Sequence, residues 1–328
     1  MRPPTRHTPT TLKIARRVLP KTFGERLWSR LVGRYDSASL ISRETRAQAV
    51  VRRLARRRPR LHHLDIHLAD HCNLNCRSCE HYSCIAEPSF ADLVLFERDL
   101  ARLAEVFEGI DQVYLLGGEP LLHPQVAEFV RSARRFLPDT RVCLMTNGVL
   151  LPRMDEPFWD AMRGTNTVLL CDDYPGVVDR PQIDVLGAEH GVNVEWMAKA
   201  EQFFRAPIDL AGTCDPSESF VRCTGLSNCA IIKDGRLFPC AHIAYADILR
   251  KRFGIEGLQP TGADSVSIYA GATGDEIIDV LTSPRPWCAH CDYAALEYFP
   301  WSRTERSLAE WVRVDEAAEP SGDPGVSA

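Results

Sequence analysis

The chain has 328 residues, of which 45% are hydrophobic and 12 are cysteines. That length suits one substantial domain plus a smaller one, and the apolar content predicts a packed core. No apolar run approaches the roughly 18 residues that a membrane-spanning helix needs, and the N-terminus lacks the apolar stretch of a secretory signal. We therefore expect a cytoplasmic protein without a membrane span.

Charge is distributed unevenly along the chain. Residues 1–60 carry 17 Lys and Arg against three Asp and Glu, whereas the remainder carries 22 against 41. We interpret residues 1–60 as a basic helical arm that lies on the acidic body of the same chain. An acidic protein partner, acidic lipid, nucleic acid or a phosphorylated substrate are the alternatives. No basic motif interleaved with aromatic residues is present, so we expect no nucleic-acid partner.

From residue 61 the pattern alternates between strands and helices. The expected strands span 63–69, 113–116, 142–145, 167–171 and 192–197, and the expected helices span 89–108, 124–136 and 182–190. We expect Ser89 to open the first helix, with Asp92 as its capping-box partner. Such alternation implies a parallel sheet with right-handed crossovers. Five strands are visible and a sixth is expected, so residues 61–210 fit an α/β partial (β/α)6 barrel.

Every unusual loop in this region follows a predicted strand. These loops are the cysteine loop at 72–84, Gly-Gly-Glu-Pro at 117–120, Thr-Asn-Gly at 146–148 and Cys-Asp-Asp at 171–173. The chemistry of barrel enzymes sits at the carboxyl ends of the strands. The four loops therefore predict one site at that end of the sheet.

Beyond residue 210 the cysteines become dense. Residues 229–240 predict a β-hairpin around Asp234 and Gly235, and residues 211–303 are expected to form a small cysteine-rich domain. Residues 304–328 include an acidic run with Pro, Gly and Ser, which predicts a tail that is disordered at its end.

The first cysteine cluster is Cys72, Cys76 and Cys79, spaced as CxxxCxxC. Three thiolates on a tight loop can hold three irons of a [4Fe–4S] cluster and leave the fourth iron open. A zinc site completed by His71 or His81 is the alternative.

This loop followed by Gly-Gly-Glu-Pro resembles the radical S-adenosylmethionine (radical SAM) superfamily over residues 61–210. The resemblance implies that the open iron binds the amino and carboxylate groups of S-adenosylmethionine. It also implies that Gly117, Gly118 and Glu119 receive the methionine amine, since a carboxylate accepts charge-assisted hydrogen bonds and glycines permit close approach. Thr146 and Asn147 are expected to contact the ribose or carboxylate, unless they form only a turn before Gly148.

The sequence departs from the family pattern at two points. Ser78 stands before the third cysteine, where the family usually has an aromatic residue. No GxIxGxxE pattern follows the fifth strand, which leaves part of the adenosine site unassigned.

The second cluster resembles the "twitch" form of the SPASM extension. The resemblance implies an auxiliary [4Fe–4S] cluster with four thiolate ligands, for which the matching positions are Cys223, Cys240, Cys288 and Cys291. Cys229 lies close enough in sequence to replace Cys223 as a ligand. A structural zinc is the alternative occupant.

Together these resemblances imply an enzyme that generates a 5′-deoxyadenosyl radical, with an electron donor such as flavodoxin or ferredoxin. The resemblance to twitch enzymes implies a sugar or aminocyclitol as substrate. It also implies that the reaction is an oxidation or an epimerisation. Modification of a peptide is one alternative, and a non-catalytic zinc or iron–sulfur protein is the other. Cys171 is a candidate hydrogen-atom donor beside Asp172 and Asp173, which are expected to bind substrate hydroxyls. The alternative is a buried strand cysteine that only packs.

Overall fold

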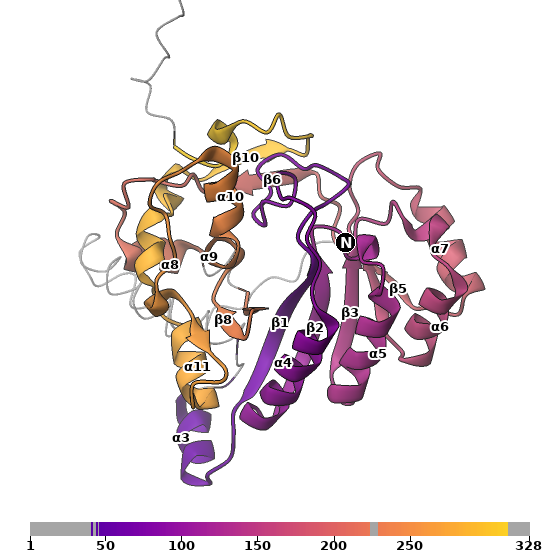
Figure 1. The fold of residues 1–328 in the computed structure, drawn as a ribbon, viewed down its shortest axis with the longest axis horizontal. Helices are drawn as coiled ribbons and strands as arrows, with labels where there is room; N and C mark the ends of the chain where they lie inside the picture. The colour runs from indigo at the N-terminus through magenta and orange to yellow at the C-terminus, as the bar shows by residue number, and fades with distance from the viewer. Residues whose placement is uncertain (1–40, 42–43, 45, 224–228, 314–328) are drawn as a thin grey trace, which may run out of the picture.

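The computed structural model describes Ile41, Glu44 and residues 46–223 and 229–313. Its main sheet has eight strands in the order β5-β4-β3-β2-β1-β7-β8-β9 (Figure 1). Strands β1 to β5 and β7 are parallel, and β8 and β9 continue the sheet antiparallel. Their bounds are Arg60–Ala69, Gly109–Gly117, Arg141–Thr146, Val168–Cys171 and Val194–Trp196 for β1 to β5, then Ile231–Lys233, Arg236–Phe238 and Val266–Ser267 for β7 to β9.

Four helices cover one face of the parallel strands (Figure 1). They are α4 (Leu93–Val106), α5 (Val126–Phe136), α6 (Glu156–Gly164) and α7 (Arg180–Glu189). Leu64, Ile66 and Leu68 of β1 point into the core beneath these helices. Because side chains alternate along a strand, His63 and Asp65 point to the opposite face, which we call the inner face.

The expected α/β class with an open parallel sheet is confirmed. The sixth parallel strand, however, is β7, which comes from beyond residue 210 and pairs with β1. The segment that follows β5 leaves the main sheet instead. Its strand β6 (Gln202–Arg205) pairs antiparallel with β10 (Glu297–Pro300) to form a separate two-stranded sheet. The sheet therefore does not close.

Local signals account for most element boundaries. Helix α4 begins at Leu93 rather than at Ser89, because Asp92 is the residue whose side chain caps it by accepting from the Leu95 N–H at 2.9 Å. The predicted hairpin is β7–β8, and its turn residues Asp234 and Gly235 both have positive φ, at 50° and 68°. Positive φ at both turn residues is what a type I′ turn requires.

A second core lies beneath the short helices α8 (Pro216–Cys223), α9 (Ala241–Ala244) and α10 (Ala246–Phe253). Trp311 and Val312 belong to this core and are 3% and 4% exposed. The prediction of a tail from residue 304 is therefore wrong for residues 304–313, because they bury apolar side chains. Residues 314–328 lie outside the described residues.

Part of the predicted basic arm is helical. Helix α3 (Arg46–Leu54) lies against α11 (Gly274–Leu281), where Arg52 pairs with Asp275 at 2.6 Å. Residues 1–40 lie outside the described residues. In the described part of the chain, no helix is both long and apolar enough to cross a lipid bilayer.

Candidate functional site

The cysteine loop leaves the carboxyl end of β1 and lines a cavity of about 390 Å³. The predicted loops after β2, β3 and β4 reach the same cavity. Its lining includes Cys72, Cys76, Cys79, Gly117, Gly118, Thr146, Asn147 and Asp172. Four loops that are separate in the sequence thus meet at one place, as parallel strands require.

Backbone and side-chain N–H groups point at the sulfurs of this loop. The Leu74 N–H donates to the Cys72 Sγ at 3.4 Å, and the Trp301 indole donates to the Cys76 Sγ at 3.2 Å. Burial raises the pKa of Cys72 to about 12 and that of Cys76 to about 11.

These sulfurs fit an iron–sulfur cluster. Such buried thiols ionise only when a cation compensates them. The three cysteines form no disulfide, so their sulfurs remain available as ligands. Three convergent thiols with N–H donors are what a cluster site needs.

The glycines of Gly-Gly-Glu-Pro allow two backbone segments to touch. The Gly118 N–H donates to the Ala69 carbonyl at 2.8 Å, and a Cβ on Gly118 would lie 2.2 Å from the His71 carbonyl oxygen. Gly117 has a φ of 146°, and a Cβ there would lie 2.2 Å from the Ala69 carbonyl oxygen. The close approach expected from these glycines is therefore to the cysteine loop itself.

Glu119 does not lie on the cavity surface. It is 0% exposed, and its carboxylate accepts from the Thr146 hydroxyl at 2.7 Å and from the Asn147 and Leu121 N–H groups at 3.0 Å. Burial raises its pKa to about 7, although these hydrogen bonds oppose the shift. The expectation that this carboxylate meets the methionine amine stays a prediction, and the described contacts show its acceptor atoms holding the neighbouring loop.

Thr146 and Asn147 do line the cavity, as expected. The Asn147 side-chain amide donates to the Asn73 side-chain oxygen at 2.7 Å and lies 3.7 Å from the Cys72 sulfur. This loop is therefore more than a turn: it connects the end of β3 to the cysteine loop.

The three residues at the end of β4 lie in three different surroundings. Cys171 is 0% exposed and packs in the main core with Leu169, on the helix-covered face. It does not line the cavity, so the structure argues against a hydrogen-donor role and favours packing. Asp172 lines the cavity, and burial raises its pKa to about 6. Asp173 lies outside the cavity lining and pairs with Arg180 at 3.6 Å.

A C-terminal strap, residues 301–311, crosses the cysteine loop, and no pattern in the sequence predicts this contact. The Arg77 N–H donates to the Ser302 carbonyl at 2.9 Å, and the Trp311 indole donates to the Cys79 carbonyl at 3.0 Å. The Ser78 hydroxyl donates to the Glu310 carbonyl at 2.8 Å. Ser78 thus binds the strap at the position where the family usually has an aromatic residue.

Tyr174 also lines the cavity.

The second cysteine set converges as well. Cys223, Cys240, Cys288 and Cys291 line one small cavity of about 20 Å³, which also contacts Trp287. Four thiols around one hollow are the donors that either a [4Fe–4S] cluster or a structural zinc ion would take. Cys229 does not line this cavity.

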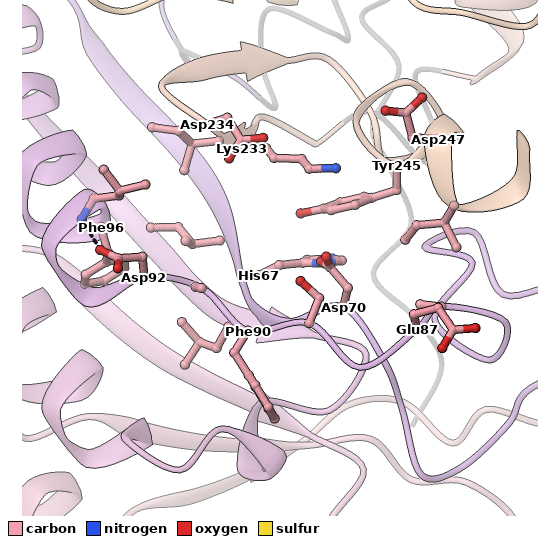
Figure 2. Close-up of a pocket in the computed structure, with 18 of the residues that line it drawn as sticks. His67, Asp70, Glu87, Phe90, Asp92, Phe96, Lys233, Asp234, Tyr245 and Asp247 are labelled. Carbon is pink, nitrogen blue, oxygen red and sulfur yellow. Dashed lines mark hydrogen bonds and ion pairs between the residues drawn. The ribbon is translucent and has the colours of Figure 1, made fainter. Parts of the chain in front are cut away.

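A larger cavity, of about 690 Å³, lies next to the end of β1 and contains none of the cysteines (Figure 2). His67 and Asp70 line one side of it, and Tyr245 and Lys233 line another. His67 also bonds His81 at 2.8 Å, and His81 lines the cysteine cavity. This His67–His81 pair therefore lies between the two cavities.

Comparisons with known proteins agree with the first cysteine site. The family model described as the radical SAM superfamily matches residues 66–170. GTP 3′,8-cyclase of Chlorobaculum tepidum is 36% identical over 99 residues, which is 30% of this chain and 29% of that protein. Molybdenum cofactor biosynthesis protein 1 of Bos taurus is 36% identical over 97 residues, which is 28% of this chain and 15% of that protein. The chain thus spans less than a third of the length of either relative.

Among solved structures, BtrN in complex with AdoMet and 2-DOIA is similar with a TM-score of 0.40 and 17% identity. The match covers 68% of this chain and 82% of that one.

Proposed function

We propose that the chain, whose residues 66–170 match the radical SAM superfamily model, is an enzyme that cleaves S-adenosylmethionine reductively and oxidises a polar small molecule. The observation that carries this proposal is the cavity in which Cys72, Cys76 and Cys79 meet the loops after β2, β3 and β4. The bound [4Fe–4S] cluster and S-adenosylmethionine supply the 5′-deoxyadenosyl radical. The chain supplies the ligands, the cavity walls and the groups that hold the substrate.

The cavity wall supports a substrate with hydroxyl or amino groups. Asp172 and Gln202 provide polar atoms, and Phe203 and Phe204 provide apolar surface. With a pKa raised to about 6 by burial, Asp172 is ionised at neutral pH and can accept a proton from a substrate hydroxyl. A sugar or aminocyclitol fits this lining. The match to the GTP cyclase covers less than a third of either chain, so it does not indicate the substrate of this chain.

Oxidation is favoured by the second cysteine site. An alcohol carbon that has lost a hydrogen atom must also lose one electron and the hydroxyl proton to become a carbonyl. The electron requires a one-electron acceptor, and the cavity formed by Cys223, Cys240, Cys288 and Cys291 is the candidate to hold one. The hydroxyl proton would pass to Asp172.

Epimerisation is the second candidate, and one observation supports it. Cys84 is 5% exposed and lines the cysteine cavity, so its thiol could donate a hydrogen atom in place of Cys171. An epimerase would incorporate solvent deuterium into its product, whereas an oxidase would give a product two hydrogens lighter. Cys84→Ala would abolish deuterium incorporation if the enzyme is an epimerase. It would leave formation of the lighter product intact if the enzyme is an oxidase.

The test of the whole proposal uses anaerobically prepared protein with dithionite and S-adenosylmethionine. We expect 5′-deoxyadenosine and methionine from the wild type and neither from the variant in which Cys72, Cys76 and Cys79 are all Ala. Iron analysis should give roughly eight irons per chain in the wild type and roughly four in this variant, as two clusters require. A colourless protein with stoichiometric zinc at both sites, or normal cleavage by the triple variant, would refute the proposal.

A further inference from the structure

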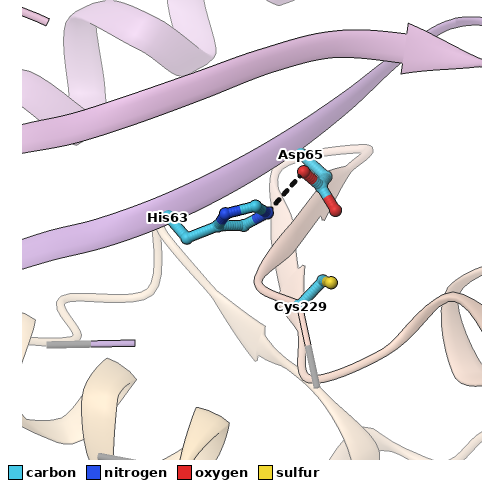
Figure 3. Close-up of side chains that lie close together, drawn as sticks. All are labelled: His63, Asp65 and Cys229. Carbon is cyan, nitrogen blue, oxygen red and sulfur yellow. Dashed lines mark hydrogen bonds and ion pairs between the residues drawn. The ribbon is translucent and has the colours of Figure 1, made fainter. Parts of the chain in front are cut away.

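A third group of ligand-type side chains lies on the inner face of the sheet, separate from both cysteine cavities. His63 and Asp65 are two residues apart on β1 and point to the same side. Cys229 lies just before β7, the strand that pairs with β1. One nitrogen, one oxygen and one sulfur from these residues all lie within 4.8 Å of one another (Figure 3).

Backbone pairing fixes Cys229 in this position. The Asp65 N–H donates to the Ala230 carbonyl at 2.8 Å, and Asp65 lies opposite Ile231 in the parallel ladder. The sulfur therefore stands beside the carboxylate because two neighbouring strands place it there. This pairing also explains why Cys229 does not line the four-cysteine cavity.

Contacts also hold the side chains of His63 and Asp65 in place. The His63 Nε2 lies 2.7 Å from the Asp65 Oδ1, and the His63 ring stacks on Tyr114 with 4.6 Å between ring centroids. The Asp65 side chain is 6% exposed, whereas that of His63 is 26% exposed. One edge of the group is therefore open to the inner face, and the rest is enclosed.

The donor set matches a particular class of metal ion. Imidazole nitrogen, carboxylate oxygen and thiolate sulfur are the ligands of zinc, which binds them at about 2.0–2.3 Å in a tetrahedral arrangement. Tetrahedral geometry at those lengths places the donors roughly 3.3–3.8 Å apart. The present separations, between 2.7 Å and 4.8 Å, bracket that range. Side-chain rotations alone would therefore form the site.

We propose that His63, Asp65 and Cys229 bind one zinc ion on the inner face of the sheet, with the fourth position open to water. On binding, the Cys229 thiol loses its proton to solvent and gains a bond to zinc. The hydrogen bond between His63 and Asp65 is replaced by a bond from each residue to the ion, and the proton of that hydrogen bond also leaves to solvent. Three protein ligands and one open position are typical of zinc sites that act on a bound molecule.

The experiment measures zinc and iron in the intact protein with both clusters in place. The protein is equilibrated with one equivalent of ZnCl₂, dialysed anaerobically and analysed by inductively coupled plasma mass spectrometry. We expect about one zinc per chain in the wild type and at least a tenfold lower zinc occupancy in Cys229→Ser and Asp65→Asn. Iron should be unchanged in both variants. Cys143→Ala is the matched control, because it removes a buried thiol from the inner face of β3, two strands away from β1, and should keep the zinc.

X-ray absorption at the zinc edge identifies the ligands directly. The proposed site predicts one sulfur at about 2.3 Å with nitrogen or oxygen ligands at about 2.0–2.2 Å. Zinc in the four-cysteine cavity would show four sulfurs instead. Four sulfurs, or equal zinc in the wild type and both variants, would overturn the proposal, as would a wild type that retains no zinc. Because neither readout needs cofactor cleavage, failure here is distinguishable from failure of the proposed enzymatic function.

Discussion

Glu119 holds its carboxylate in full burial, and its hydrogen-bond acceptors are taken by the loop after β3 and by its own turn. Its carboxylate therefore holds Thr146 and Asn147, which line the cavity. Removing this buried acceptor leaves several N–H and O–H donors without a partner. Each unpaired buried donor lowers the stability of the fold.

We expect Glu119→Gln to weaken S-adenosylmethionine binding about tenfold, because a loss of about 1.4 kcal/mol from a misplaced Thr146–Asn147 loop corresponds to that factor. Thr146→Val removes only one of the three hydrogen bonds and should have a smaller effect. Equilibrium binding and iron content check both variants. A lower melting temperature with unchanged affinity would mean that Glu119 is only structural.

Trp301 donates the one indole hydrogen bond that the described residues offer to a sulfur of the cysteine loop. An N–H that points at a cluster sulfur stabilises the more negative, reduced state. Trp301→Phe keeps an aromatic ring but removes this donor, so we expect the cluster potential to fall by about 40 mV, the equivalent of about 1 kcal/mol for one electron.

A redox titration followed by electron paramagnetic resonance measures that potential. Trp311→Phe is the matched control, because its indole donates to the Cys79 carbonyl rather than to a sulfur. An equal shift in the two variants would attribute the effect to the strap as a whole.

At the scale of elements, α3 is joined to α11 by charge. The Asp275 carboxylate accepts hydrogen bonds from Arg52 and Arg53, and Arg52 also bonds Glu44. The hydrogen bond from Arg52 is the main cause that lowers the pKa of Asp275 below its usual value. A carboxyl whose pKa is lowered by folding stabilises the folded state at pH values above its unfolded pKa, and this contribution is lost as the pH falls.

We therefore expect Asp275→Asn to lower the free energy of unfolding by about 1 kcal/mol at pH 7, since the pair is partly exposed to solvent. The difference from the wild type should shrink as the pH falls below about 4, where the wild-type carboxyl is protonated. Urea unfolding at several pH values measures it. Asp279→Asn on the exposed side of α11 is the control and should have no effect at any pH; a constant difference for Asp275→Asn would contradict the charge argument.

Helix caps and strand ends were the parts of each element that sequence predicted least well. Both Ser89 and Asp92 are capping residues by type, and only the backbone path decided between them. The alternation of apolar residues in β1 and β2, by contrast, was sufficient to locate both strands within a few residues.

At the level of the whole molecule, the described contacts between the N-terminal region and the rest of the chain begin at Ile41. Ile41 is 0% exposed in the main core, and α3 makes the contacts with α11. Removing residues 1–40 leaves all of these contacts, whereas removing residues 1–55 eliminates them. We expect the longer deletion to lower the melting temperature by roughly 4–8 °C, mainly through exposure of the Ile41 site, and the shorter one to change it little.

Cofactor cleavage should survive both deletions, because none of the described residues that line the cysteine cavity lies before Cys72. Calorimetry and 5′-deoxyadenosine assays on the two truncated proteins check this. Loss of iron from the protein that lacks only residues 1–40 would show that the arm supports the clusters.

Local patterns in the sequence were sufficient to predict that the cysteine loop and three strand-end loops meet at one place. The spacing of Cys72, Cys76 and Cys79, and the loops that follow three strands, are local patterns, and parallel pairing brings strand ends together without further information. The class of the fold followed from the same alternation of strands and helices.

Which side chains face the cavity and which face the core depends on contacts between segments that are distant in the sequence. Whether Cys171 enters the cavity or the core depends on one residue of strand register. Cys229 lies beside Asp65 because β7 pairs with β1, and the paired residues Asp65 and Ile231 are 166 positions apart in the chain. The strap over the cysteine loop and the burial of Glu119 likewise arise from contacts between distant segments. Such contacts leave no periodic signal in the sequence, because each is satisfied by a single pair of residues in the folded chain.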